Sequence, residues 1–266
     1  MTEYLTSADG TRIAFERKGS GPALILVDGA MCYRGNGPND ALADALADRF
    51  TVYTYDRRGR GESGDTAPYA VEREYEDLEA LVKEAGGDPY LYGISSGGAL
   101  ALDAVAAGLP VRKLALYEVP YVVDRSRRLI PDDYESTMDT LVAQGRRGAA
   151  VSLFMSKGVG LPGFVVAMMH LMPAWSKLKA VAHTLPYDTG FTAPLQRGEP
   201  LPRDRWAGVT VPTAVVAGTK SPRWMRTAMR ELAAVIPGAE HHDLPGQTHI
   251  VKPAALAPVL ARHFRN

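Results

Sequence analysis

The sequence predicts an α/β fold in which a mostly parallel sheet is flanked by helices and interrupted by an inserted helical segment. Three observations predict this fold. Short apolar runs alternate with longer amphipathic runs along the chain, a pattern typical of a parallel sheet covered on both faces. A glycine-flanked serine lies between an apolar run and a small-residue run. A long central stretch without strand-like runs replaces the short connection that a compact sheet needs.

The strand predictions rest on apolar and β-branched runs bounded by turn residues. The first two predicted strands form a hairpin, because the Asp9-Gly10 pair between them tolerates the positive φ of a tight turn. The predicted strands are Glu3 to Ser7, Arg12 to Arg17, Ala23 to Val27, Thr51 to Tyr55, Pro89 to Ile94, Arg112 to Tyr117, Val211 to Ala217 and Ala239 to Leu244.

The helix predictions rest on apolar residues at i, i+3 and i+4 spacing. Acidic residues gather early in the second predicted helix, where they favour the positive end of the helix dipole. The predicted core helices are Asn39 to Asp48, Glu72 to Ala85, Ser96 to Ala107, Trp224 to Val235 and Ala254 to Phe264.

The central stretch is interpreted as a helical cap inserted after the sixth strand. It holds helical patterns, many prolines and five of the nine methionines. The predicted division is therefore a core formed by residues 1–123 and 205–266, and a cap formed by residues 124–204. A chain of 266 residues is long enough for one such domain.

Composition narrows the possible partners and the location. Thirty basic and thirty acidic side chains cancel, so no global field draws the protein to nucleic acid or to an anionic membrane. A small-molecule substrate is the expected partner, and the oligomeric state stays open. Cys32 is the lone cysteine, the first residues lack the basic and apolar regions of a signal peptide, and no apolar run is long enough for a membrane span. These features favour the cytoplasm.

The residues Gly93-Ile94-Ser95-Ser96-Gly97 match the pattern G-x-S-x-G. The match gains meaning from its place between a predicted strand and a predicted helix, because a sharp turn there lifts the serine oxygen above the sheet. Glycines on both sides let the strand and the helix approach each other closely. Ser95 is therefore the candidate nucleophile.

This turn resembles the nucleophile elbow of the α/β-hydrolase superfamily, and the segment from Asp56 to Ser63 resembles the D-x-R-G-x-G-x-S turn of the same superfamily. The resemblance covers nearly the whole chain and is strongest to capped, serine-dependent bacterial esterases. It implies an α/β-hydrolase fold and ester-type chemistry, because the elbow carries a serine where dehalogenases and epoxide hydrolases carry an aspartate. The segment from Asp56 to Ser63 is interpreted as structural.

A serine hydroxyl needs a base to act as a nucleophile at neutral pH. His249 is the candidate, because it lies in a loop between the last predicted strand and the last predicted helix and follows the serine in chain order. That loop resembles the seat of the superfamily's histidine. The remaining histidines fall in the cap, on the last strand or in the last helix, and are interpreted as surface or packing residues.

The third member of the triad departs from the commonest pattern. In most relatives an aspartate follows the strand that corresponds to Val211 to Ala217, but the turn from Gly218 to Ser221 has no carboxylate. Glu118 directly follows an earlier strand, as in some relatives with a displaced acid. We expect it to orient His249 and to stabilise the imidazolium. Asp124 and Asp243 stay as weaker alternatives.

Acyl transfer also needs donors for the developing oxyanion. The backbone N–H groups of Ser96 and Ala30 are the candidates, the first after the nucleophile and the second after Asp28-Gly29. Asp28 stands where relatives more often have histidine. A buried carboxylate there is unfavourable unless it is paired, so we expect Asp28 to point away or to contact Arg34 or Arg57.

Four side chains are candidates for a partly apolar substrate pocket. They are Met31, which follows the oxyanion loop, and Met155, Met168 and Trp175 in the cap, although helical spacing also fits a role in the core of the cap. No metal-ligand spacing, phosphate loop or dinucleotide motif stands out, so no cofactor or metal is expected.

These residues predict hydrolysis of an ester-like small molecule, a carboxylic ester, lactone or thioester, through an acyl-enzyme on Ser95. Two alternatives stay open because a fold does not determine a reaction. One is a lyase or cyclase that uses the same pocket, and the other is a ligand receptor with little turnover.

Overall fold

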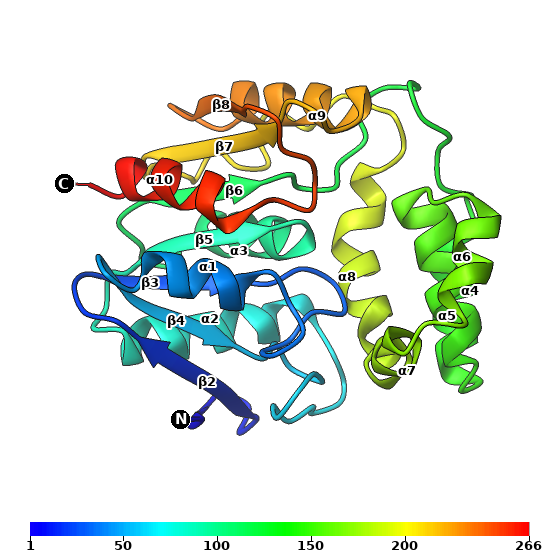
Figure 1. Ribbon diagram of the computed structural model, residues 1–266, viewed down its shortest axis with the longest axis horizontal. Helices are drawn as coiled ribbons and strands as arrows, with labels where there is room; N and C mark the ends of the chain where they lie inside the picture. Colours follow the sequence, from blue (N-terminus) through cyan, green and yellow to red (C-terminus); the bar gives the residue numbers. More distant parts are fainter. Residues whose placement is uncertain (266) are drawn as a thin grey trace.

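Eight strands form one sheet in the order β1-β2-β4-β3-β5-β6-β7-β8 in a computed structural model that describes residues 1–265 (Figure 1). The β1–β2 and β2–β4 pairs are antiparallel and every other neighbouring pair is parallel. The predicted mostly parallel sheet is confirmed. The strands are β1 Glu3–Thr6, β2 Arg12–Lys18, β3 Ala23–Val27, β4 Thr51–Tyr55, β5 Tyr90–Ile94, β6 Leu114–Tyr117, β7 Thr213–Gly218 and β8 Glu240–Leu244.

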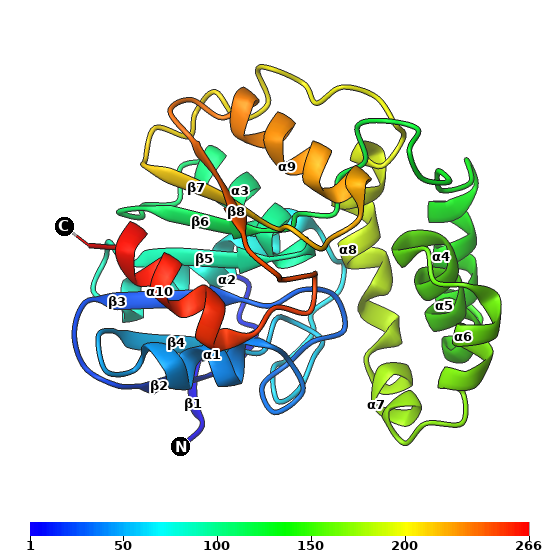
Figure 2. The ribbon, with the colours of Figure 1, turned by 45° about the horizontal axis from the view of Figure 1, so that its top comes forward.

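Helices cover both faces of this sheet (Figure 2). Alternate residues of each central strand point to opposite faces, so that Ile25 of β3 packs in one apolar cluster with α2, α3 and α9, and Leu24 packs in a second cluster with α1 and α10. The covering helices are α1 Asn39–Leu46, α2 Val71–Glu84, α3 Ser96–Ala106, α9 Arg223–Val235 and α10 Pro253–His263.

A helical insertion, defined here as residues 134–195, separates β6 from β7 in the chain and has an apolar cluster of its own. Helix α8 of this insertion lies against the sheet domain together with the short turns η2 and η3, while α4 to α7 lie farther out (Figure 1). Its members are α4 Tyr134–Ala143, α5 Arg147–Leu153, the π-helical turn η1 Phe154–Val159, α6 Gly163–Met169, α7 Ala174–Ala180, η2 Ala182–Thr184, α8 Leu185–Thr192 and η3 Ala193–Leu195. No helix within residues 1–265 has both the length and the apolar character needed to cross a bilayer.

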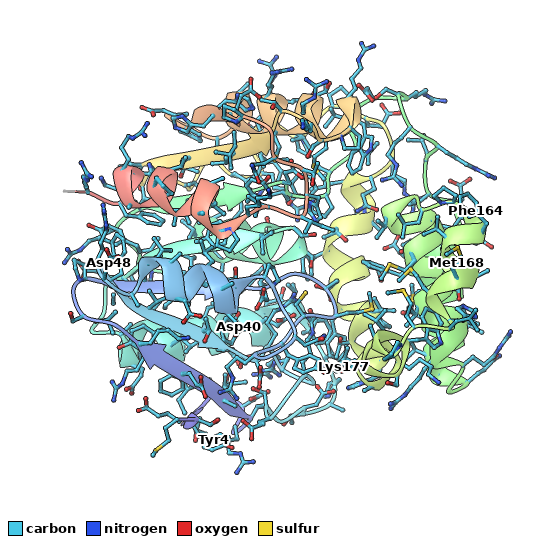
Figure 3. All side chains as sticks on the ribbon, viewed as in Figure 1. Tyr4, Asp40, Asp48, Phe164, Met168 and Lys177 are labelled. Atoms are coloured by element: carbon cyan, nitrogen blue, oxygen red, sulfur yellow. The ribbon has the colours of Figure 1, made fainter. Side chains whose placement is uncertain are left out.

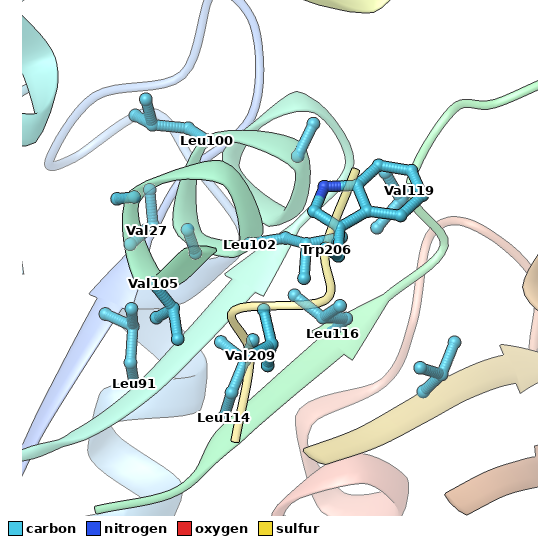
Figure 4. Close-up of a cluster of buried hydrophobic side chains, with 14 of the residues drawn as sticks. Val27, Leu91, Leu100, Leu102, Val105, Leu114, Leu116, Val119, Trp206 and Val209 are labelled. Carbon is cyan, nitrogen blue, oxygen red and sulfur yellow. The ribbon is translucent and has the colours of Figure 1, made fainter. Parts of the chain in front are cut away.

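The segment that follows the insertion returns to the sheet domain through Trp206. Its indole ring is fully buried, stacks on Tyr121 with ring centroids 5.6 Å apart, and donates its N–H to Asp103 Oδ1 at 2.7 Å. Figure 4 shows the ring against side chains of the sheet and of α3, among them Leu102 and Leu116. Trp206 therefore anchors the chain between the insertion and β7.

The register of the parallel strands places their carboxyl ends along one edge of the sheet. Val27 pairs with Gly93, Ile94 pairs with Tyr117, and Tyr117 pairs with Val216. Loops that follow β3, β5, β6 and β7 consequently meet at this edge, which is where open α/β sheets bind their ligands. The insertion lies beside the same edge (Figure 1).

Truncation of Trp206 tests this anchor. We expect Trp206→Ala to lower the free energy of unfolding by about 3–5 kcal/mol, because it leaves a cavity and removes one of the donors to the Asp103 carboxylate, which keeps its pair with Arg205. Trp206→Phe should cost less, since it loses the indole hydrogen bond but keeps most of the apolar contacts. Urea unfolding of the two variants beside the exposed-site control Tyr4→Phe measures the difference, and equal stability of all three would contradict the assignment.

Candidate active site

Ser95 lies at a sharp turn between β5 and α3. Its φ of 57° and ψ of −132° are sparsely populated for a residue with a side chain, a conformation that costs about 1–3 kcal/mol. A Cβ on Gly93 would approach the Gly97 carbonyl oxygen to 2.5 Å, and a Cβ on Gly97 would collide with the carbonyl oxygens that follow β3. Only glycine fits at both places, so the turn that lifts Ser95 above the sheet depends on this pair.

Glu118 ends the neighbouring strand and contacts the candidate base. It directly follows β6, has a φ of 47° and is fully buried. Its Oε2 lies 3.0 Å from His249 Nδ1. A buried carboxylate in this position accepts the Nδ1–H of the ring and stabilises the imidazolium. Asp124 and Asp243, the weaker alternatives, bind Ser126 and Arg230 instead.

The second carboxylate oxygen of Glu118 is held by the turn that follows β7. Oε1 accepts a hydrogen bond from the Gly218 backbone N–H at 2.8 Å and a short one from the Ser221 hydroxyl. The turn that lacks a carboxylate of its own thus supplies two donors to Glu118. The sequence analysis did not identify Ser221 as a partner of Glu118. The hint in the sequence was a hydroxyl residue at the end of a turn that has no carboxylate of its own.

The loop that carries His249 is anchored at several points. The Tyr117 hydroxyl donates to the Thr248 carbonyl oxygen at 2.7 Å, and the Lys220 N–H donates to the Gln247 carbonyl oxygen at 2.9 Å. The His249 side chain is 44% exposed. The His249 ring bonds to Glu118, and within residues 1–265 no hydrogen bond joins it to the Ser95 hydroxyl.

The loop after β3 lies against Ser95. A Cβ on Gly29 would approach the Ser95 Cβ to 3.0 Å. The N–H groups of Ala30 and Ser96 have no acceptor within the part of the chain that the structure describes, and Ser96 is the first residue of α3, where the helix dipole favours negative charge. Free donors next to a serine oxygen are the elements of an oxyanion hole.

The Asp28 carboxyl forms no hydrogen bond or ion pair with Arg34 or Arg57, the two arginines that the sequence suggested. Arg34 binds Asp56 and Glu62, and Arg57 reaches only the Asp28 backbone carbonyl oxygen, at 3.4 Å. The Asp28 carboxyl packs against Gly37, and its Oδ1 has no hydrogen-bond partner among residues 1–265. Burial, with a smaller effect of the Asp40 carboxylate, raises the pKa of Asp28 to about 7. A protonated carboxyl avoids the penalty of an unpaired buried charge.

Two arginines of the turn after β4 join the core to the insertion. Arg57 forms a bidentate pair with Glu74, with both distances 2.7 Å, and binds Asp188 of α8 at 2.7 Å. Arg60 binds the other oxygen of Asp188. All four side chains are buried. Burial alone would raise the pKa of Asp188, but the two guanidinium groups hold it below its usual value.

The four candidate pocket residues lie in different surroundings. Met31 is buried and has a φ of 60°, and it packs into the apolar cluster of the helical insertion together with Trp175. Met155 is half-buried against the same cluster. Met168 is 63% exposed on the outer side of the insertion (Figure 3). The structure therefore gathers three of the four residues and leaves Met168 apart from them. No group of three His, Cys, Asp or Glu side chains that could hold a metal ion occurs in residues 1–265.

Comparisons with known proteins agree with this architecture. The family model described as "Alpha/beta hydrolase family" matches residues 26–259. The crystal structure of an alpha/beta hydrolase from Sphaerobacter thermophilus DSM 20745 is 50% identical with a TM-score of 0.90, and the match covers 99% of this chain and 100% of that chain. A thermophilic esterase from Thermogutta terrifontis is 23% identical with a TM-score of 0.64, covering 98% of this chain and 97% of that one, and shares the fold.

One curated relative matches over a shorter stretch. The "Uncharacterized hydrolase YraK" of Bacillus subtilis (strain 168) is 37% identical over 101 residues, which are 35% of this chain and 35% of that protein. The match thus spans about a third of the length of the relative.

The pKa of Asp28 generates a prediction about stability and pH. The native chain binds a proton at Asp28 between about pH 4 and pH 7 that the unfolded chain has lost. The stability that Asp28 contributes is therefore fully present below about pH 4 and is lost progressively as pH rises to about 7. The Asp28→Asn variant has no titrating group at this position. As pH rises from 5 to 9, the free energy of unfolding of the wild type should therefore fall by roughly 2 kcal/mol relative to that of the variant. Denaturant unfolding at both pH values measures the change.

Asp48 provides a matched control, because its carboxylate is 70% exposed and lies on the surface (Figure 3). Asp48→Asn should leave the pH dependence of stability unchanged. If Asp28→Asn has the same pH dependence of stability as the wild type, Asp28 is ionised throughout this range and the prediction is wrong.

Proposed function

Because the chain belongs to the alpha/beta hydrolase family, we propose that it is a serine hydrolase that cleaves an ester-like small molecule through an acyl-enzyme on Ser95. The substrate is a carboxylic ester, a lactone or a thioester. The observation that carries the proposal is the 3.0 Å contact between His249 Nδ1 and the buried Glu118, one strand away from a serine on a strained turn. This arrangement supplies a nucleophile, a base and an acid at one edge of the sheet.

The first step is attack of the Ser95 oxygen on the carbonyl carbon. Glu118 occupies Nδ1 of the His249 ring, which leaves Nε2 free to take the Ser95 proton. The ring must approach the hydroxyl for this transfer, and such contacts often tighten only when substrate binds. His249 then returns the proton to the leaving alcohol or thiol. Water, activated by the same ring, releases the acyl group from Ser95.

The N–H groups of Ser96 and Ala30 would hold the oxyanion. Both lack an acceptor among residues 1–265, and both adjoin Ser95, one in sequence and the other through the contact of Gly29 with the serine. Each such donor contributes about 3 kcal/mol to lowering the barrier. No metal or cofactor is needed for this sequence of steps.

The helical insertion would act as the cap over this site. Its apolar cluster includes Met31 from the oxyanion loop and Trp175, and Met155 packs against it. Because this apolar cluster adjoins the loop after β3, a partly apolar acyl or alcohol group is the substrate chemistry that we propose. A cytoplasmic location is part of the proposal, because a single cysteine offers no internal disulfide of the kind that secreted proteins use.

Intact-protein mass spectrometry after treatment with a small fluorophosphonate tests the triad. We expect one adduct on the wild type, because an activated serine displaces fluoride from phosphorus, and no adduct on Ser95→Ala. Labelling of His249→Ala should slow by roughly 1,000-fold or more, and labelling of Glu118→Gln should also slow strongly, because the ring loses its charge partner.

Ser136→Ala is the matched control, since it removes an exposed serine hydroxyl of α4 that lies outside the proposed site. It should label like the wild type. If the folded wild type takes no adduct, the acyl-enzyme proposal fails and the lyase, cyclase or receptor alternatives replace it. An adduct that survives Ser95→Ala would place the nucleophile elsewhere.

A further inference from the structure

We infer that Arg60 is a positioning residue that aims the Ala30 N–H at the oxyanion and that depends on the helical insertion to do so. The inference rests on the proposed function, because the oxyanion belongs to that reaction. Through Arg60, the helical insertion would influence the oxyanion hole. The proposed nucleophile, base and acid make no such connection to the insertion.

The contacts of Arg60 connect the two regions directly. Its side chain is fully buried. Nη1 donates to the Gly29 carbonyl oxygen at 2.9 Å, Nη2 pairs with Asp188, and Nε donates to the Thr184 hydroxyl at 3.2 Å. Asp188 and Thr184 both belong to the insertion, in α8 and in η2. One guanidinium group therefore bonds to the insertion on two sides and to the oxyanion loop on the third.

Peptide geometry turns the contact with Gly29 into control of Ala30. The Gly29 carbonyl and the Ala30 N–H belong to one planar trans peptide, in which they point in opposite directions. A donor that holds the carbonyl on the Arg60 side consequently holds the N–H on the other side. Gly29 also lies against Ser95. The Cys32 N–H reaches the same carbonyl oxygen at 3.3 Å, a longer and uncharged contact, so the charge-assisted bond from Arg60 is the main restraint.

The position of Arg60 depends on Asp188. This carboxylate is shared with Arg57, whose own Nη1 reaches the Asp28 carbonyl oxygen at 3.4 Å. Both peptide units that precede Ala30 are therefore held by guanidinium groups whose common anion comes from the insertion. Displacement of α8 would leave two buried cations with one carboxylate, Glu74, between them, an unfavourable state. The oxyanion donor is thus oriented only while the insertion is seated on the core.

Arg58 provides an internal comparison in the same turn. It is equally buried and forms a bidentate pair with Asp77 and a second pair with Asp9. It contacts neither the loop after β3 nor the helical insertion. If both arginines are purely structural, substitution should lower stability and activity in the same way at both positions. If Arg60 is a positioning residue, only its substitution should lower kcat.

The experiment compares Arg60→Lys with Arg58→Lys, using p-nitrophenyl acetate as the probe substrate. Sites are first counted by fluorophosphonate labelling of Ser95, so that kcat refers to folded enzyme. We expect kcat of Arg60→Lys to fall roughly 10- to 100-fold with KM within about threefold, because a misdirected donor weakens only the transition state. Arg58→Lys should lower the melting temperature but keep kcat within about twofold.

A second variant guards against failure of Arg60→Lys to fold. Thr184→Val preserves the shape of the side chain and removes the hydroxyl that accepts from Arg60 Nε and donates to the Val181 carbonyl oxygen within the insertion. The loss of the contact with Arg60 should lower kcat several-fold with KM unchanged. The inference is overturned if Arg60→Lys and Arg58→Lys lose kcat equally, or if Arg60→Lys changes only KM. If Arg60→Lys does not fold, a normal kcat in Thr184→Val overturns it instead. Absence of labelling in the wild type would instead overturn the proposed function, so the two failures are distinct.

Discussion

Two guanidinium groups and two carboxylates, those of Arg57, Arg60, Glu74 and Asp188, neutralise one another in buried space between the sheet and the helical insertion. None of these ions is tolerable there alone, because desolvation of an unpaired charge costs several kcal/mol. The turn after β4, helix α2 and helix α8 must therefore come together in one arrangement. The loop after β3 is drawn into the same arrangement, since both arginines also donate to its carbonyl oxygens.

Glu118 shows the same principle on a smaller scale. Its buried carboxylate is compensated by the Gly218 N–H, the Ser221 hydroxyl and the ring of His249. The proposed role of Glu118 as the acid needs no change in topology, because β6 and β7 are parallel neighbours whose carboxyl ends lie side by side. The chain moves the carboxylate by one strand and keeps the turn after β7 as its support.

The strands, their order along the chain and the serine turn were predictable because local patterns encode them. Buried strands read as short apolar runs, and a turn with glycines on both sides of a serine has few other meanings. The interior of the insertion was less predictable. Its short helices include a π-helical turn and two 3₁₀ turns, and methionines at helical spacing do not reveal which face is covered. Met168, one of the candidates for the pocket, is 63% exposed (Figure 3).

The sequence by itself determined the kinds of elements, their order along the chain and the candidates Ser95, His249 and Glu118, because each of these is written in a short window. The tertiary structure alone decided which charges pair. Arg57 meets Asp188 across 131 residues, and Ser221 meets Glu118 across 103. Periodicity carries no information about such pairs, since buried ions choose partners by the space that the packed core leaves between distant segments.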